Sequence, residues 1–418
     1  MSLQRREPPW IPPGALVIGG LSQGLSWLLL LALALRGEDS LGPHTLAWIH
    51  LVALGWLTMV ALAILIFAAP NFTDATLRGE RLARFALYPF ALGAYLMVAG
   101  FLAERFAAVA WGAAILAASL ALYLLPMLAA LGVAAARAPR TERAIARALS
   151  GVLVMLAAAA ALGVVMALAL ALGVAHGVLT RGPAIHAHLA GVGWLTILIF
   201  GISMQTLGPI AGRRPARRWR HITLGILALL GVLVVSAALA AASGALLWIG
   251  ALSIACAVVL YLFDLFEALA GARNPHRPPQ AFLAAAGLWL ALAVALGLGV
   301  VAGARWQNAY VYVALVGWLG QIVNGHLHHI PVRLMATMVR GEQDETDPAE
   351  VLSAPLSWLA WALAQLAVAC GAAALLAGAT PLLAFAALCG LAGWCAMLLN
   401  ASSAYRRLSV PRSTISLL

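Results

Sequence analysis

The sequence predicts an all-α membrane protein that crosses the bilayer about twelve times. Three observations support this fold class: 64% of the residues are hydrophobic, only 9% are charged, and the mean hydropathy is +0.99. The apolar residues form unbroken runs of about 20 residues or more, enough to cross about 30 Å of hydrocarbon as a helix. Because lipid offers the backbone no hydrogen-bond partner, such runs must be helices; barrel strands would give shorter, alternating segments. The expected surroundings of the chain are therefore a lipid bilayer, with no sizeable soluble domain.

The apolar runs divide the chain into helices of similar length, which we treat as a single transmembrane domain over residues 1–418. The expected spans are 14–36, 45–69, 84–103, 108–134, 148–174, 185–210, 221–242, 244–270, 281–303, 307–331, 353–378 and 380–400. The first run has no adjoining cleavage site, so we interpret it as a retained helix rather than a signal peptide.

The arginines predict the orientation, because basic loops stay on the cytoplasmic side of a membrane. The chain has no lysine, and all 25 of its basic residues are arginines. Only four of them fall on the opposite side: Arg36, Arg105, Arg181 and Arg305. We therefore expect a multi-pass protein of a bacterial-type inner (cytoplasmic) membrane with both termini in the cytoplasm. The formal charge of +11 is a topology signal, and no basic domain interleaved with aromatic residues predicts nucleic-acid binding.

A nine-residue motif occurs three times. His50 begins HLVALGWLT in the second predicted span, His188 begins HLAGVGWLT in the sixth, and Tyr312 begins YVALVGWLG in the tenth. Each motif stands four spans after the previous one. This spacing predicts three four-helix pseudo-repeats, at about 1–140, 141–277 and 278–418, around an axis normal to the membrane. Repeats of this kind form binding sites where they meet.

The first residues of the three motifs, His50, His188 and Tyr312, fall at similar depths because their spans run in the same direction. We expect them to face one another about two turns below the outer surface. A glycine and a tryptophan follow each histidine and predict a flat cleft with an aromatic wall, which suits a planar macrocycle: Gly55, Trp56, Gly193 and Trp194.

His186 stands two positions before His188, so the two side chains project about 200° apart on a helix. The two histidines therefore address different clefts. From the residues alone, His186 is either a ligand in the second cleft or a hydrogen-bonding partner of a neighbouring helix.

The His-x-His at residues 186–188 and the Gly-Trp that follows, on one of about twelve spans, resemble subunit I of the heme-copper oxidases and nitric oxide reductases. The chain is also similar to the stand-alone NnrS proteins in length, span count and histidine placement. The resemblance implies that His50 and His188 are axial ligands of a haem b iron and that His186 faces a second cleft, so one haem or two are expected. It further implies respiratory electron transfer or nitric oxide-related chemistry, with a quinol or cytochrome as electron donor; an enzymatic activity would be that of an oxidoreductase of this type.

The sequence departs from that family in several motifs. The His-x-His lies on the sixth span rather than the tenth, where Tyr310-Val-Tyr312 stands instead. It has no copper-binding histidine pair after a sixth-span histidine, no His-Pro-Glu-Val-Tyr motif and no C-x-x-C-H for covalent haem. Copper and catalysis are therefore left open. The alternative is a membrane transporter or ion carrier with a histidine-lined central site and no haem.

A second histidine cluster, His326, His328 and His329, ends the tenth predicted span. It lies about 21 Å below the motif residues at 1.5 Å per residue, so it cannot share their ligand. The cluster is a candidate second metal site, although a solvated rim or a proton entrance is favoured. His221 and His276 stand among arginines in predicted loops, and no role is predicted for them.

Two carboxylates, Asp264 and Glu267, lie three positions apart on the eighth predicted span and project to one side of the helix. Ionisable groups inside a membrane are costly enough to suggest a function. Both residues are therefore candidates for a proton path near the cytoplasmic face.

Overall fold

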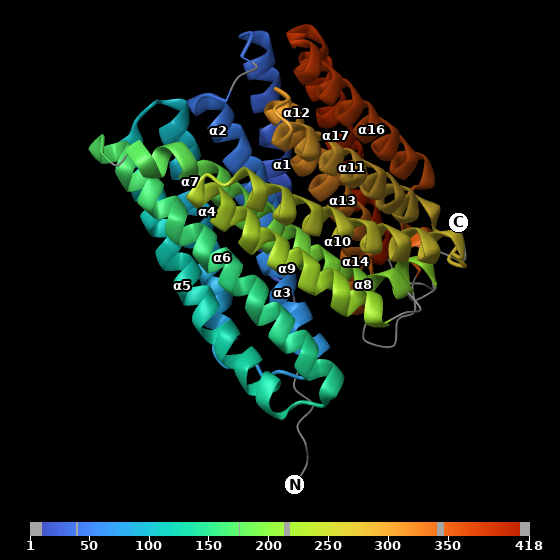
Figure 1. Ribbon diagram of the computed structural model, residues 1–418. Coiled ribbons are helices and arrows are strands. Elements are labelled where there is room, and N and C mark those ends of the chain that lie inside the picture. Colours follow the sequence, from blue (N-terminus) through green and yellow to red (C-terminus); the bar gives the residue numbers. More distant parts are fainter. Residues whose placement is uncertain (1–10, 39–40, 175, 213–217, 341–346, 410–418) are drawn as a thin grey trace. The chain divides into compact units, whose positions relative to one another are not determined.

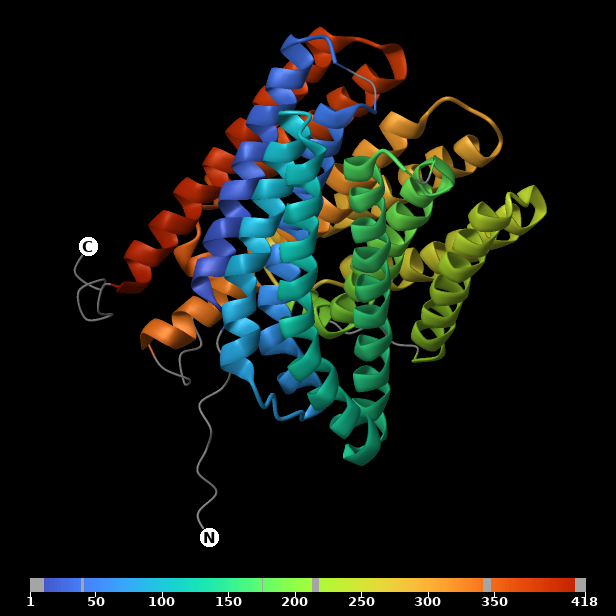
Figure 2. The ribbon, with the colours of Figure 1, turned by 90° about the vertical axis from the view of Figure 1, so that its left-hand side faces the viewer.

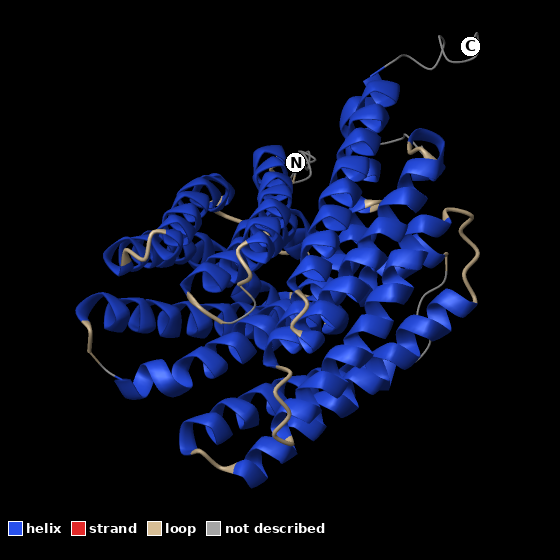
Figure 3. Cartoon of the chain, turned by 90° about the horizontal axis from the view of Figure 1, so that it is seen from above, coloured by secondary structure: helices blue, strands red, loops and turns tan. Residues whose placement is uncertain are grey.

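The structure is a computed structural model that describes residues 11–38, 41–174, 176–212, 218–340 and 347–409. Within these ranges the chain consists of helices joined by loops and turns, without a strand (Figure 3). Eleven helices of the described part are long and apolar enough to cross a membrane. The prediction of an all-α membrane protein is confirmed. Both termini, for which we predict a cytoplasmic location, lie outside the described residues.

Figure 1 follows the helices along the chain. Their bounds are α1 Pro13–Leu35, α2 Pro43–His50, η1 Leu51–Thr58, α3 Met59–Thr73, α4 Glu80–Leu102, α5 Phe106–Arg137, α6 Arg140–Leu172, α7 His176–His188, η2 Leu189–Thr196 and α8 Ile197–Ala211. They continue as α9 Arg218–Ala241, α10 Gly244–Ala270, α11 Arg277–Val301, α12 Gln307–Tyr312, η3 Val313–Gly320, α13 Gln321–Leu327, α14 Ile330–Arg340, α15 Pro348–Val351, α16 Ala354–Ala377 and α17 Thr380–Ser409. The elements named η are π-helices.

The structure differs from the predicted spans in count and in length. The tenth span, 307–331, is helical as α12, η3 and α13 but is not among the eleven candidate spans. The side chains of Gln321, Asn324 and His326 account for this, because they lower the hydropathy of its second half. Conversely, α5 and α6 contain 32 and 33 residues, or about 50 Å of helix each, so the arginines expected in the loop between them belong largely to helix ends.

Helix ends follow the local sequence. Pro43 is the first residue of α2, where no helical partner exists for the N–H that proline lacks, and Pro355 lies in the first turn of α16. Gly173 and Gly378 follow the last residues of α6 and α16, and both have a φ of 65°. A residue with a Cβ is strained in this left-handed conformation, so glycine ends these helices.

The chain divides into two compact units. Unit 1 contains Met1–Ser26, Leu41–Gly201 and Leu229–Gly250, and unit 2 contains Trp27–Ser40, Ile202–Ala228 and Ala251–Leu418. These boundaries do not coincide with those of the predicted repeats.

In unit 1, α4 and α5 lie side by side along much of their length (Figure 2). Their backbones come very close at Gly93 and Gly112: a Cβ added to Gly93 would lie 2.8 Å from the carbonyl oxygen of Gly112. Small residues permit this approach, which is how helices gain packing energy in lipid. α4 also contacts α2, and α6 contacts α5, α7 and η2. This packing holds the helices that carry His50, His186 and His188.

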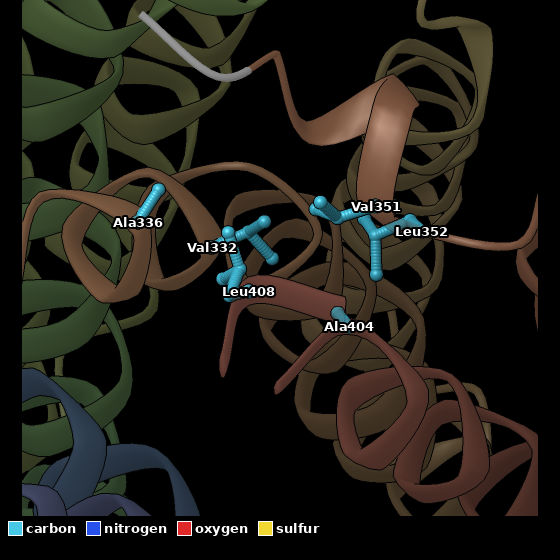
Figure 4. Close-up of a cluster of buried hydrophobic side chains, with 6 residues drawn as sticks. All are labelled: Val332, Ala336, Val351, Leu352, Ala404 and Leu408. Atoms are coloured by element: carbon cyan, nitrogen blue, oxygen red, sulfur yellow. The ribbon is translucent and has the colours of Figure 1, made fainter. Parts of the chain in front are cut away.

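In unit 2, α16 and α17 form another closely packed pair, and α14 and α15 pack against α17. A cluster of buried apolar side chains joins α14, α15 and α17 and the residue after α15 (Figure 4): Val332, Ala336, Val351, Leu352, Ala404 and Leu408. The cluster attaches two short helices to the end of α17.

Candidate functional site

The three motifs share an unexpected backbone conformation. A π-helix of eight residues begins directly after each of His50, His188 and Tyr312: Leu51–Thr58, Leu189–Thr196 and Val313–Gly320. π-Helical turns are rare and often mark functional sites. Sequence reasoning missed them, and the only available signal was the repetition of the motif itself.

His50 is the last residue of α2, and its ring orientation is fixed from two sides. Nδ1 donates a hydrogen bond to the carbonyl oxygen of Leu46, 2.7 Å away. The ring stacks on Phe101 of α4, with centroids 5.3 Å apart and planes inclined by 25°. Since a carbonyl oxygen only accepts, Nδ1 carries the proton of the neutral ring and Nε2 carries a lone pair. Metal-bound histidines commonly have this arrangement.

His186 lies on α7 and is held by a neighbouring helix. Its Nδ1 donates to the carbonyl oxygen of Ala159 on α6, 2.9 Å away, and its ring also lies against Gly163, one turn further along α6. The centroids of the His186 and His50 rings are 6.3 Å apart, and their planes differ by 27°. Two imidazoles bound to opposite sides of one metal have centroids about 6 Å apart, from metal–nitrogen bonds of about 2 Å. The two rings are stacked, at a centroid separation equal to that of two imidazoles on one metal.

His188 has a different environment. Its Nδ1 donates to the carbonyl oxygen of Ala184 on its own helix, 2.8 Å away, and no ring contact with His50 occurs among the described residues. The structure thus brings His50 together with His186, not with His188 as the resemblance implied. His186 and His188 project about 200° apart, and the packing of α7 on α6 decides which one meets His50. Within the described chain, Nε2 of His50, His186 and His188 has no hydrogen-bond partner.

The glycines and tryptophans of the first two motifs lie in packed helix contacts rather than along an open cleft. A Cβ on Gly55 would lie 2.9 Å from Oγ of Ser22, and one on Gly193 would lie 3.2 Å from the side chain of Met155. Trp194 donates from Nε1 to Oγ1 of Thr58, 3.1 Å away, in a buried contact that links the first two motifs. Trp56 is also buried, and its Nε1 has no partner in the described structure.

Tyr312, the counterpart of the two motif histidines, belongs to unit 2. Its hydroxyl donates to the carbonyl oxygen of Ala367 on α16, 2.8 Å away, and its ring packs against the backbone at Gly371. The side chain is 1% exposed, so it contributes to the contact between α12 and α16.

The histidines of the second cluster do not converge. Both ring nitrogens of His326 are engaged: Nδ1 with the carbonyl oxygen of Ile322 at 2.7 Å, and Nε2 with Oγ1 of Thr206 at 2.8 Å. His328 donates from Nδ1 to its own helix, whereas Nδ1 of His329 is buried without a partner. Across the residues that the structure describes, no group of three His, Cys, Asp or Glu side chains could hold a metal ion. The geometry therefore gives the candidate second metal site no support.

The two candidate proton-path carboxylates lie in an ion-pair network between α9 and α10. Nε of Arg220 is 3.0 Å from Oδ1 of Asp264, and its Nη2 donates to Oε2 of Glu267 at 2.5 Å. Nδ1 of His221 is 3.2 Å from Oδ2 of Asp264. The expectation that His221 is an unremarkable loop residue is wrong: it lies in the first turn of α9. His276, also expected in a loop, is the loop residue directly before α11, and its side chain is buried.

Comparisons with known proteins do not identify a function for this site. No protein-family model matches the chain, and no curated protein is similar to it in sequence. The likeness to the heme-copper oxidases and the NnrS proteins therefore rests only on the motif residues, the chain length and the predicted number of spans.

Proposed function

We propose that this chain is a haem-binding membrane protein in which His50 and His186, both in unit 1, hold one iron from opposite sides. The spacing of their rings carries the proposal, because 6.3 Å between centroids fits two imidazoles on a common metal. Each Nδ1 donates to a backbone carbonyl, which leaves each Nε2 as a free donor atom. The absence of a C-x-x-C-H motif favours a non-covalent haem of the b type.

The pair of histidine ligands favours electron transfer over nitric oxide-related chemistry, the two functions that the resemblance implies. With both His50 and His186 as ligands, the iron would have no free position for a small gas, and the haem would supply one-electron transfer. We therefore propose electron transfer within the membrane, from a quinol or cytochrome donor. The chain's own part is to fix the two rings, through Leu46 and Phe101 for His50 and through Ala159 for His186.

Nitric oxide-related chemistry is the second candidate function. It requires a haem iron with one protein ligand and a free coordination position on the opposite side. His188 is the observation that favours it: its Nδ1 is anchored in the same way, and its Nε2 has no partner among the described residues. Under this candidate, His188 holds a second haem, and the protein is an oxidoreductase of the nitric oxide reductase type. Copper has no ligand set in the part of the chain that the structure describes.

We also propose that the fold consists of three four-helix repeats of the heme-copper oxidase subunit I type in a bacterial-type inner membrane, with both termini in the cytoplasm. The three π-helices, one directly after the first residue of each motif, support the repeats. The arginine asymmetry supports the orientation.

Optical spectra of the purified full chain and four alanine variants test the ligand assignment. His50→Ala and His186→Ala should each open an axial position, so the low-spin spectrum should become high-spin or the haem should be lost. His188→Ala should keep the low-spin signal, as should the control His44→Ala, which changes a histidine at the start of the same helix as His50. A low-spin spectrum that survives both His50→Ala and His186→Ala would refute the pair. Loss in His188→Ala with retention in His186→Ala would restore the pair implied by the resemblance.

The carrier alternative has its own outcome. A purified chain without haem, whose spectrum also shows no change on adding haem and reductant, would favour a histidine-lined carrier site. Retention of about one haem per chain would exclude that alternative.

A further inference from the structure

Four ionisable side chains meet inside unit 2, where α9 and α10 run through candidate membrane spans. Arg220 and His221 come from α9, and Asp264 and Glu267 from α10. Asp264 has 0% exposure, whereas the side chain of Glu267 is 35% exposed and marks the surface end of the group. The group lies outside the proposed haem site, which belongs to unit 1.

The charges of this group do not balance when His221 is neutral. One arginine faces two carboxylates, so the four residues carry a net charge of −1. Burying an unbalanced charge is unfavourable, because surrounding protein and lipid screen it poorly. One added proton makes the group neutral.

The geometry indicates where that proton binds. Arg220 meets Oδ1 of Asp264, and His221 meets Oδ2, so the carboxylate lies between two basic side chains. Neither oxygen receives a hydrogen bond of good geometry in the described structure, so the carboxylate is held by charge alone. The side chain of His221 is 24% exposed although its Nδ1 is buried, so another part of the ring reaches the molecular surface. A positively charged His221 ring satisfies the carboxylate better than a neutral one.

The polar groups continue inward from this point. Tyr261 lies one turn before Asp264 on α10, and its hydroxyl donates to Oγ of Ser203 on α8, 3.1 Å away. Both residues are fully buried, and the Tyr261 ring meets Trp318 of the third motif edge-on at 5.5 Å. From Glu267 to Tyr261 the polar line extends about 9 Å along the helix. An ion pair that only stabilised the surface would not need polar residues such as Tyr261 and Ser203 further inside the protein.

We propose that His221 is a proton-uptake site: it takes one proton from water on the arginine-rich side of the membrane, and Asp264 holds the resulting cation. Nδ1–H faces the carboxylate, and the incoming proton binds Nε2. The charged groups that face His221 are Arg220 on its own helix and Asp264 on α10, and Glu267 on α10 pairs with Arg220. Burial and Arg220 oppose protonation of the ring, and the negative charge of Asp264 favours it. This proposal does not depend on haem binding.

The test is a titration of the full chain in lipid nanodiscs, followed by NMR of ¹⁵N-labelled histidine. His221→Gln assigns the resonance among the 10 histidines. In the wild type, His221 should titrate with a single midpoint between about pH 4 and about pH 9, the range of carboxyl and imidazole groups. Asp264→Asn should weaken its proton binding at least about tenfold, because an opposite charge within 4–6 Å favours the charged ring by about that factor or more.

Two further variants test the proposal if Asp264→Asn does not fold. Asp264→Asn leaves Arg220 without its buried partner and can prevent folding, so Glu267→Gln, which retains the Arg220–Asp264 pair, is the second variant. It should also weaken proton binding by His221, because Arg220 loses its second carboxylate partner and its positive charge then opposes protonation of the ring more strongly. Glu80→Gln, which breaks the pair of Glu80 with Arg84 on α4, is the matched control and should change nothing. A His221 that stays neutral throughout, or an unchanged midpoint in Glu267→Gln, would overturn the proposal.

Discussion

Gly163 offers a test of the haem site that leaves both ligands in place. A Cβ at this position would lie 3.1 Å from Cε1 and 3.5 Å from Nδ1 of His186, so the ring must move by a few tenths of an ångström. That movement weakens the bond from Nδ1 to the carbonyl oxygen of Ala159. Losing a hydrogen bond of this kind is worth about 0.5–1.5 kcal/mol, or about a two- to tenfold loss of haem affinity.

Gly163→Ala should lower the haem affinity but leave the thermal stability of the chain unchanged or raise it. Alanine in a helix interior is favoured over glycine by about 0.5–1 kcal/mol, so the chain should unfold at the same or a higher temperature. Gly151→Ala on the same helix is the matched control, because a Cβ there meets nothing within 4 Å. Haem titration of the apoprotein and thermal unfolding in detergent measure the two effects. Equal haem affinities for Gly163→Ala and Gly151→Ala would refute the assignment of His186 as a ligand.

Three other predictions concern the fold. Gly93→Ala should destabilise the chain by about 1–3 kcal/mol, because its Cβ would meet the backbone of α5, whereas Gly132→Ala in open space should be neutral or stabilising; similar unfolding temperatures would contradict this. Thr58→Val should cost about 1–3 kcal/mol by leaving the buried Trp194 N–H without an acceptor, and an unchanged unfolding temperature would refute that. Burial lowers the pKa of His276, so the folded chain resists protonation that the unfolded chain accepts below about pH 6.5, and acid should destabilise it. His276→Gln should therefore flatten the fall of the unfolding temperature below that pH, and an unchanged slope would count against it.

The candidate site was predicted in part. The sequence placed His50 on one helix and His186 and His188 on another, and it predicted similar depths for His50, His188 and Tyr312, because a helix rises by a fixed distance per residue. It also indicated that His186 and His188 face different ways. It did not indicate which of the two meets His50, nor that a π-helix follows each motif.

The partners of Asp264 and Glu267 were not predicted either. Two carboxylates three positions apart necessarily share a helix face, so their proximity followed from sequence. Arg220 and His221, however, stand at the start of another helix, among arginines expected in a loop. Only the packing of α9 against α10 brings these charges together.

The sequence by itself determined that this protein is a bundle of membrane helices and where most of them lie. The physical reason is that lipid leaves an apolar chain of this composition no other way to satisfy its backbone hydrogen bonds. The tertiary structure decided the rotation of each helix about its axis. For α7, that rotation depends on Ala159 and Gly163 of α6, whose small side chains admit the His186 ring and leave the ring of His188 facing elsewhere.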